Sequence, residues 1–262
     1  MTTEYSAAGD PKRSLELLWG AEGRDDRPGR PGPKPRLTVD GIVRAAIEIA
    51  DAEGLAALSM RRVAERLGVT AMSLYTYVPG KAELIDVMLD RVYGETTTPA
   101  EPEGGGWRAR LQAIARDNRA RYLRHPWLLQ VATSRPVLGP NETARYDREL
   151  RAVDGLGLSD VEMDLVVSVL SDYVHGAVRG AVESAQAQRR TDLTDEEWWQ
   201  ARAPLLEKVL DVTRFPTATR VGAAAGAEYG SAHDPARAFE LGLRLILDGL
   251  QALIQARSDE SG

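Results

Sequence analysis

Cysteine is absent from the 262 residues of this chain, and no apolar run approaches the ~20 residues that a membrane-spanning helix needs. The absence of cysteine excludes a disulfide framework, a cysteine zinc site and a thiol nucleophile. The N-terminus also lacks a positively charged region followed by an apolar stretch, which is the pattern of a secretory signal. We therefore expect a globular cytoplasmic protein without a membrane partner, long enough for one or two hydrophobic cores.

The signatures of catalysis are missing too. The sequence has no glycine-rich phosphate loop, no nucleophile elbow, and no cluster of His, Asp and Glu at metal-ligand spacing. Carboxylates such as Asp164 and Asp172 are scattered along one predicted helix, which favours a pocket or interface role over an acid–base pair. We expect no catalytic residue, no metal and no cofactor, and keep a helical enzyme only as an alternative.

Basic charge is in deficit overall but unevenly distributed. The formal net charge is −6, whereas the segment Arg24–Lys81 holds ten basic residues against seven acidic ones. A mildly basic N-terminal part on an acidic body is typical of a small nucleic-acid-binding unit joined to a domain with another function.

Two segments rich in proline and glycine divide the chain. Arg27–Arg36 contains four prolines, which lack a backbone N–H, so residues 1–36 are predicted to form a flexible basic arm. An arm of this kind either reaches a minor groove or is a solvated tail without DNA contact. Its candidate DNA-binding residues are Arg27, Arg30, Lys34 and Arg36. The second segment, Thr96–Gly106, ends the N-terminal domain.

Three predicted helix starts between these segments share one pattern. Each has an apolar residue, then a hydroxyl residue, then an apolar residue four positions further on, and the hydroxyl residues are Thr38, Ser59 and Thr70. Such a hydroxyl can accept a hydrogen bond from a free backbone N–H while the apolar pair packs together. The pattern predicts helices over about 39–53, 60–67, 71–77 and 81–93, in a compact domain at residues 37–95.

The remainder reads as helical, because no long stretch alternates apolar and polar residues with period two. A capping box at Ser159–Glu162 opens a long helix to about residue 186, and Asp234-Pro235 opens the last helix, to about residue 256. The segment 215–233 is rich in glycine and alanine and is predicted to be a loop. We expect an all-α protein with a helical domain over residues 107–257.

The turn Gly68-Val69-Thr70 between two short predicted helices indicates a helix-turn-helix motif. In this geometry Leu74 and Val78 pack on the other helices, while the opposite face enters a DNA major groove. Lys81, at the start of the next helix, adds a positive charge for a phosphate. The positions free to face DNA are Thr70, Ala71, Met72, Ser73, Tyr75, Thr76 and Tyr77.

The string Gly54–Val92 resembles the DNA-binding domain of the TetR/AcrR family of bacterial regulators. The resemblance is carried by the Leu67-Gly68-Val69 turn, the Leu74-Tyr75-x-Tyr77-Val78 helix and Lys81-x-x-Leu84. It implies a base contact from Arg61, a recognition face at Ala71, Met72 and Thr76, and phosphate contacts from Ser59, Ser73, Tyr75, Tyr77 and Lys81. Ala71 and Met72 are suited to apolar contact with thymine methyl groups.

The C-terminal part resembles the tetracycline repressors more loosely, through Trp107, His125 and Thr133-Ser134-Arg135-Pro136. The resemblance implies a ligand-binding domain for a small-molecule effector of unknown identity. Val131 stands where tetracycline repressors carry a magnesium-ligating histidine, so tetracycline–magnesium is not the expected effector. The candidate ligand-binding residues, for which ordinary packing is the alternative, are His125, Trp127, Val131, Arg135, His175 and Trp198.

The resemblance also implies a homodimer in which the helices at 160–186 and 235–256 form a four-helix bundle with their copies. The last helix supports this independently, because its leucines and isoleucines cover more than one face and Gly242 and Gly249 permit close approach. We therefore predict a repressor that a small molecule releases from a palindromic double-stranded DNA operator. An effector-independent DNA-binding dimer is the alternative.

Overall fold

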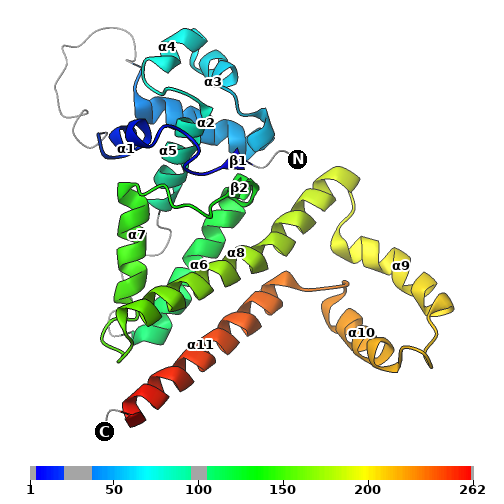
Figure 1. Ribbon diagram of the computed structural model, residues 1–262. Coiled ribbons are helices and arrows are strands. Elements are labelled where there is room, and N and C mark those ends of the chain that lie inside the picture. Colours follow the sequence, from blue (N-terminus) through cyan, green and yellow to red (C-terminus); the bar gives the residue numbers. More distant parts are fainter. Residues whose placement is uncertain (1–3, 21–36, 96–104, 261–262) are drawn as a thin grey trace. The chain divides into compact units, whose positions relative to one another are not determined.

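The computed structural model describes residues 4–20, 37–95 and 105–260, and Figure 1 shows that helices dominate it. The all-α expectation is confirmed, with two short strands, β1 (Glu4–Tyr5) and β2 (Val131–Ala132), added to the helices. The chain divides into two compact units. The first comprises residues 1–168 and 257–262, and the second comprises residues 169–256.

The first unit contains a helical head, which we define as residues 37–95. Its helices are α2 (Val39–Glu53), α3 (Met60–Leu67), α4 (Ala71–Tyr75) and α5 (Lys81–Tyr93), with a 3₁₀ turn, η2 (Leu55–Ala57). The three predicted hydroxyl caps are confirmed. Thr38 accepts a hydrogen bond from Gly41 N at 3.0 Å, Ser59 from Arg62 N at 3.2 Å, and Thr70 from Ser73 N at 3.3 Å.

Residues 4–20, which we call the N-terminal strap, are folded against the head. β1 pairs in parallel with β2, and α1 (Pro11–Gly20) contacts α5. The buried carboxylate of Asp86 on α5 accepts hydrogen bonds from Ala7 N at 2.8 Å and Ser14 Oγ at 3.0 Å. The expectation of a flexible arm is therefore wrong for residues 4–20, while Arg27, Arg30, Lys34 and Arg36 lie outside the described residues.

The hydrophobic core of the head continues beyond the head itself. Ile42, Val63 and Leu84 belong to one buried cluster with Trp127 and Val131. The last two lie in η3 (Pro126–Gln130) and β2, which follow α6 (Trp107–Arg124). A shared core makes the head and the start of the C-terminal domain one packed body.

The remaining helix of the first unit is α7 (Pro140–Arg151), which contacts α5. Buried Asp90 on α5 accepts hydrogen bonds from Asn141 Nδ2 and Glu142 N, both at 2.9 Å. The predicted capping box at Ser159 and Glu162 is confirmed by reciprocal hydrogen bonds of 2.9 and 3.3 Å, and it opens α8 (Asp160–Thr191).

The second unit contains most of α8, together with α9 (Asp195–Val209), α10 (Pro216–Tyr229) and most of α11 (Pro235–Glu260). The rings of Tyr173 on α8 and Phe239 on α11 stack at 5.8 Å. A side chain at Gly242 would begin 2.5 Å from the hydroxyl oxygen of Tyr173, so glycine is what permits these two helices to approach.

The predicted loop at 215–233 is wrong, because residues 216–229 form α10. A run of alanines, Ala223–Ala225, supplies helix propensity that outweighs Gly222 and Gly226. In the part of the chain that the structure describes, no helix combines the length and apolar character required to span a membrane.

Candidate nucleic-acid interface

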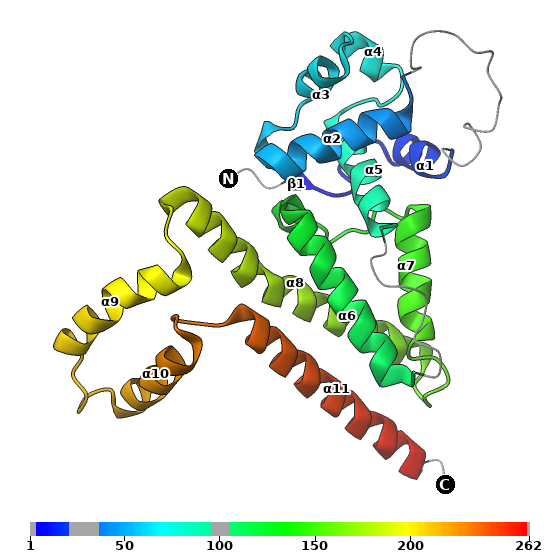
Figure 2. The same cartoon turned by 180° about the vertical axis from the view of Figure 1, so that it is seen from behind.

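Helices α3 and α4 form a helix-turn-helix at the outer end of the first unit. Gly68 ends α3 in the left-handed conformation, at φ 66° and ψ 30°, which glycine adopts without steric cost. The chain then reverses through Val69, and Thr70 caps α4. Figures 1 and 2 show from opposite sides that α3 and α4 lie at the end of this unit away from α7. The motif is therefore open to a partner.

The short helix α4 has one buried face and one exposed face. Leu74 and Val78 are fully buried in the core of the head, as the sequence predicted. On the opposite face Met72 is 76% exposed and Tyr75 is 47% exposed, and Tyr77 is exposed as well. These three side chains lie on α4 and the turn that follows it, and they form a compact surface with both apolar and hydroxyl groups. Such a surface suits contacts with base edges and phosphates.

The other predicted DNA-facing residues lie around this surface. Ser59 and Thr70 are exposed at the starts of α3 and α4, and the hydroxyls of Thr70 and Ser73 are 2.9 Å apart. Ala71 is half-buried, whereas Thr76 is exposed. The structure therefore brings all the predicted residues of α4 to one end of the unit, although two of the hydroxyls also serve as helix caps.

The arginines of α3 are held by carboxylates on the protein surface. Arg61 Nε lies 2.9 Å from Glu65 Oε1 one turn further along α3, and both side chains are exposed. Arg62 and Arg66 pair with glutamates of α2, at 3.0 and 2.7 Å. Exposed pairs contribute only about 0–1 kcal/mol, so these guanidinium groups can exchange a carboxylate for a phosphate or a base at small cost. The spacing of four residues between Arg61 and Glu65 in the sequence is the signal that predicts this pair.

Lys81 has a partner that no local pattern reveals. Its Nζ lies 2.7 Å from Oε1 of Glu4 in the N-terminal strap, and both side chains are about two-thirds covered, at 32% exposure each. The predicted phosphate contact is thus paired within the chain, 77 residues away in sequence. A DNA phosphate at this point has to replace Glu4 or add to it.

The candidate ligand residues of the first unit are mostly structural. His125 is 4% exposed, with Nδ1 2.8 Å from Asp51 Oδ1 and Nε2 3.0 Å from Glu95 Oε2. Trp127 is buried and donates its indole N–H to the same oxygen of Asp51 at 2.8 Å. Val131 is buried in β2 opposite Glu4. Packing therefore accounts for these three residues.

The other candidates are more accessible. Arg135 is exposed, and its backbone carbonyl accepts a hydrogen bond from Ser6 Oγ at 2.6 Å. In the second unit His175 is half-buried on α8, where burial and the charge of Arg179 lower its pKa. Trp198 on α9 is exposed, with the guanidinium of Arg202 4.5 Å above its ring. The six candidates are thus divided between the two units.

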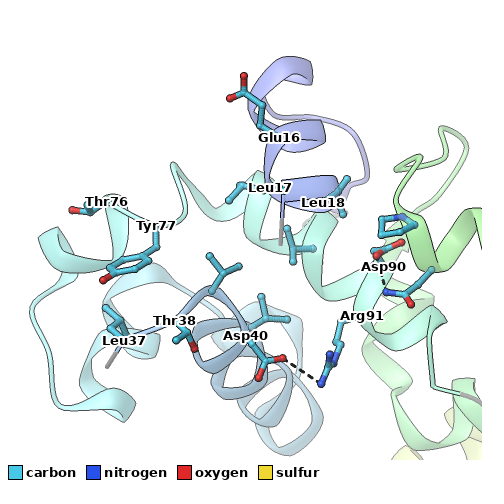
Figure 3. Close-up of a pocket in the computed structure, with 16 residues that line it drawn as sticks. Glu16, Leu17, Leu18, Leu37, Thr38, Asp40, Thr76, Tyr77, Asp90 and Arg91 are labelled. Carbon is cyan, nitrogen blue, oxygen red and sulfur yellow. Dashed lines mark hydrogen bonds and ion pairs between the residues drawn. The ribbon is translucent and has the colours of Figure 1, made fainter. Parts of the chain in front are cut away.

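A cavity of about 680 Å³ lies in the first unit between α1, the start of α2, the end of α4, α5 and the start of α7. Figure 3 shows Asp40 and Arg91 paired on one wall, at 3.2 Å, with Tyr77 from the DNA-facing side and Leu17 from the N-terminal strap nearby. None of the candidate ligand residues lines it. Its rim includes Gly20 and Leu37, which flank residues outside the described range.

An exposed helix-turn-helix on a packed helical core that continues into further helices is the arrangement found in DNA-binding transcriptional regulators. Residues 42–88 match the family model described as bacterial regulatory proteins of the tetR family. Residues 98–254 match the model of the tetracyclin repressor-like C-terminal domain. The chain belongs to the TetR family.

Relatives and solved structures agree with this assignment. The chain is 49% identical over 260 residues to the HTH-type transcriptional repressor DrrR1 of Streptomyces coeruleorubidus, covering 99% of this chain and 93% of that protein. It is 28% identical to the class A tetracycline repressor of Escherichia coli, covering 82% and 91%. ActR of Streptomyces coelicolor, solved in complex with actinorhodin, matches with TM-score 0.68 and 34% identity, covering 84% of this chain and 97% of that one.

Proposed function

We propose that this protein represses transcription by binding a two-fold symmetric DNA operator as a homodimer, and that a small molecule bound to the C-terminal domain releases it. The ligand-responsive DNA-binding repressor is the function that the family models and the relatives support. The exposed face of α4, opposite buried Leu74 and Val78, is the observation that carries the DNA-binding part.

The head offers two kinds of contact to DNA. Arg61 is assigned to a guanine edge in the major groove, where its guanidinium can donate two hydrogen bonds, and Met72 to a thymine methyl group. Phosphate contacts that fix the register are assigned to the hydroxyl and ammonium groups around them. These are Ser59, Ser73, Tyr75, Tyr77 and Lys81, with Thr70, Ala71 and Thr76 completing the recognition face.

The homodimer is assigned to exposed apolar stripes on α8 and α11. On α8, Val161, Leu165 and Val169 are exposed at intervals of four residues and therefore lie on one face. On α11, Leu241, Leu245, Gly249 and Leu253 follow the same interval, and Leu245 is 63% exposed. Both helices also have a buried face within their own chain, which includes Val178 and Leu247. Each helix thus has a second apolar face for a second copy.

We assign the effector to small molecules that resemble actinorhodin, the ligand in the ActR complex. Buried Val131 replaces the histidine of tetracycline repressors and supplies no metal-ligating atom, so tetracycline–magnesium is not expected to release the protein. The alternative is a DNA-binding dimer that responds to no effector.

The proposal is tested by selecting bound sequences from a random duplex pool with the purified full-length protein at near-physiological salt. A two-fold symmetric consensus is expected, and failure to enrich any sequence would contradict DNA recognition. The selected duplex then serves as the probe for release by actinorhodin, with tetracycline and magnesium as the comparison. Release by actinorhodin alone supports the effector class, whereas release by neither compound favours the effector-independent dimer.

A further inference from the structure

His125 is a buried histidine with a carboxylate on each ring nitrogen. It follows the last residue of α6, and its Nδ1 and Nε2 lie 2.8 and 3.0 Å from oxygens of Asp51 and Glu95. A neutral imidazole has one N–H and one acceptor nitrogen, and an ionised carboxylate only accepts hydrogen bonds. Both contacts can be hydrogen bonds only when both ring nitrogens carry a proton. The geometry therefore requires an imidazolium.

The surroundings favour the same charge. The indole N–H of Trp127 donates to the Asp51 oxygen that faces His125, which holds that carboxylate in position at 2.8 Å. Glu95 is shared with Arg124, whose Nη1 lies 3.2 Å from it.

A second guanidinium lies close by. Arg121, one turn before His125 on α6, donates to the backbone carbonyl of Glu95 at 3.2 Å and is itself paired with Asp117 at 3.0 Å. Among the described residues, the two carboxylates beside the ring are therefore balanced only when Arg124 is joined by a cationic His125.

The pKa directions agree on both sides of the contact. Burial lowers the pKa of His125, but the hydrogen bonds and charges of Asp51 and Glu95 outweigh it, so the pKa is raised. Burial raises the pKa of Glu95, but His125 and Arg124 outweigh it, so that pKa is lowered. Each group thus stabilises the charged form of the other.

The three partners come from the ends of three different elements. Asp51 is in the last turn of α2, Glu95 follows the end of α5, and His125 caps α6. Helix α2 packs against α3, which leads into the recognition helix. A dimer that reads two major grooves about 34–36 Å apart, or a multiple of that distance, requires each head to be held at a fixed angle to the rest of its chain. The contact joins the ends of two helices of the head to the end of α6.

We infer that His125 is protonated at neutral pH and acts as the positioning residue that holds the DNA-binding head to α6, so that operator affinity depends on its charge. The inference rests on the proposed function for its effect on operator binding. It gives His125 a role inside the protein, as a residue that joins the head to α6.

The pH dependence has a definite sign. Because the folded state raises the pKa of His125 above its unfolded value of ~6.5, the stabilisation is complete below that value and is lost as the pH rises through the folded pKa. Raising the pH should therefore loosen the head and weaken operator binding.

The charge itself is measured by following the ring nitrogens of the histidines by NMR in the intact protein. The chain has three histidines, so His175→Gln and His233→Gln assign the signals. Two protonated nitrogens at His125 at pH 7, with deprotonation at higher pH, are expected. Asp51→Asn, which keeps an acceptor for Trp127, should move the deprotonation to lower pH. A neutral His125 at pH 7 would overturn the inference.

The positioning role is measured as affinity for the selected operator and for random DNA between pH 6.5 and 9. Operator affinity of the wild-type protein should fall as the pH rises through the raised pKa of His125, while His125→Gln should start lower and remain flat. Arg44→Gln removes an exposed cation of α2 that pairs with Asp40 and with neither Asp51 nor Glu95, and it should retain the wild-type profile.

Identical pH profiles for the wild-type protein and His125→Gln would overturn the positioning role and leave the proposed function standing. If no operator can be selected at all, the proposed function fails instead, and the NMR titration still decides whether the imidazolium exists.

Discussion

The DNA-binding head (residues 37–95) and the α9–α10 region (residues 195–229) are both helical, yet they bury their side chains very differently. In the head, Leu74, Leu84 and Met88 are fully buried, and the helices pack in succession, with α4 on α3, α3 on α2 and α2 on α5. Among the described residues 195–229, neither helix has a buried residue, and large apolar side chains such as Leu205 and Val209 are exposed. The head therefore buries its core within its own chain, whereas the α9–α10 region leaves apolar side chains exposed, as surfaces that bind a partner or a ligand do.

The difference matches the division of function. A domain that recognises DNA should be rigid before it binds, because conformational entropy that is lost on binding lowers the affinity. A region associated with a second copy or an effector gains its burial only in the assembled or ligand-bound state. Stability effects should therefore concentrate in the head, and assembly effects in the C-terminal helices.

The largest expected effect is in the core of the head. Leu74→Ala removes a fully buried side chain and should lower the free energy of unfolding by about 2–5 kcal/mol. The matched change Leu205→Ala on α9, where the side chain is exposed, should cost less than about 0.5 kcal/mol in the same protein. Denaturant unfolding measures both. Equal losses of unfolding free energy would mean that Leu205 on α9 is already buried in the protein.

The next effect is on assembly. Leu245→Glu places a charge on the exposed stripe of α11 and should dissociate the proposed dimer, because an unpaired buried carboxylate costs several kcal/mol. Gln251→Glu adds the same charge at an exposed position of α11 outside that stripe and is the control. Sedimentation measures both masses. A Leu245→Glu protein that remains dimeric would remove α11 from the interface.

Within the head, base reading and phosphate binding should separate. Arg61→Ala should cost ~1–3 kcal/mol and relax preference at one base position, whereas Lys81→Ala should weaken binding to every sequence and reduce the salt slope by about 1. Titrations on operator and random duplex at several salt concentrations distinguish them. If Arg61→Ala lowers both affinities equally, Arg61 contacts a phosphate.

The smallest effect concerns the N-terminal strap. Glu4→Gln removes the charge that faces Lys81 and should strengthen binding to all DNA by a few-fold, within the 0–1 kcal/mol that such a pair carries. Glu16→Gln, an exposed change on the same strap, is the control. No change in the salt dependence of Glu4→Gln would show that Lys81 is not near a phosphate.

Sequence reasoning was most accurate where the determinants are local. The caps at Thr38, Ser59 and Thr70 and the turn at Gly68 depend on residues within four positions of each other, and all were predicted. The family resemblance rests on the same short spacing. Local signals therefore define the head and its candidate DNA-facing surface almost completely.

What the sequence did not predict depends on partners that are distant in sequence or on residues with opposing helix propensities. The N-terminal strap is folded because Ala7 and Ser14 bind Asp86, more than 70 positions away, and no spacing rule reveals that. His125 caps the end of α6, and no spacing rule reveals its two carboxylates, because they come from distant elements. The helix α10 formed where alanines competed with glycines.

The most direct test of the central claim uses the selected operator and a copy with five base pairs inserted between its half-sites. Five base pairs rotate one half-site by about half a helical turn, so two heads fixed in one dimer cannot reach both. Two protomers per intact duplex and at least about a 100-fold loss on insertion are predicted, because specific complexes are typically 10³–10⁷ times tighter than non-specific ones. Equal affinity for both duplexes would contradict a dimeric operator-reading repressor.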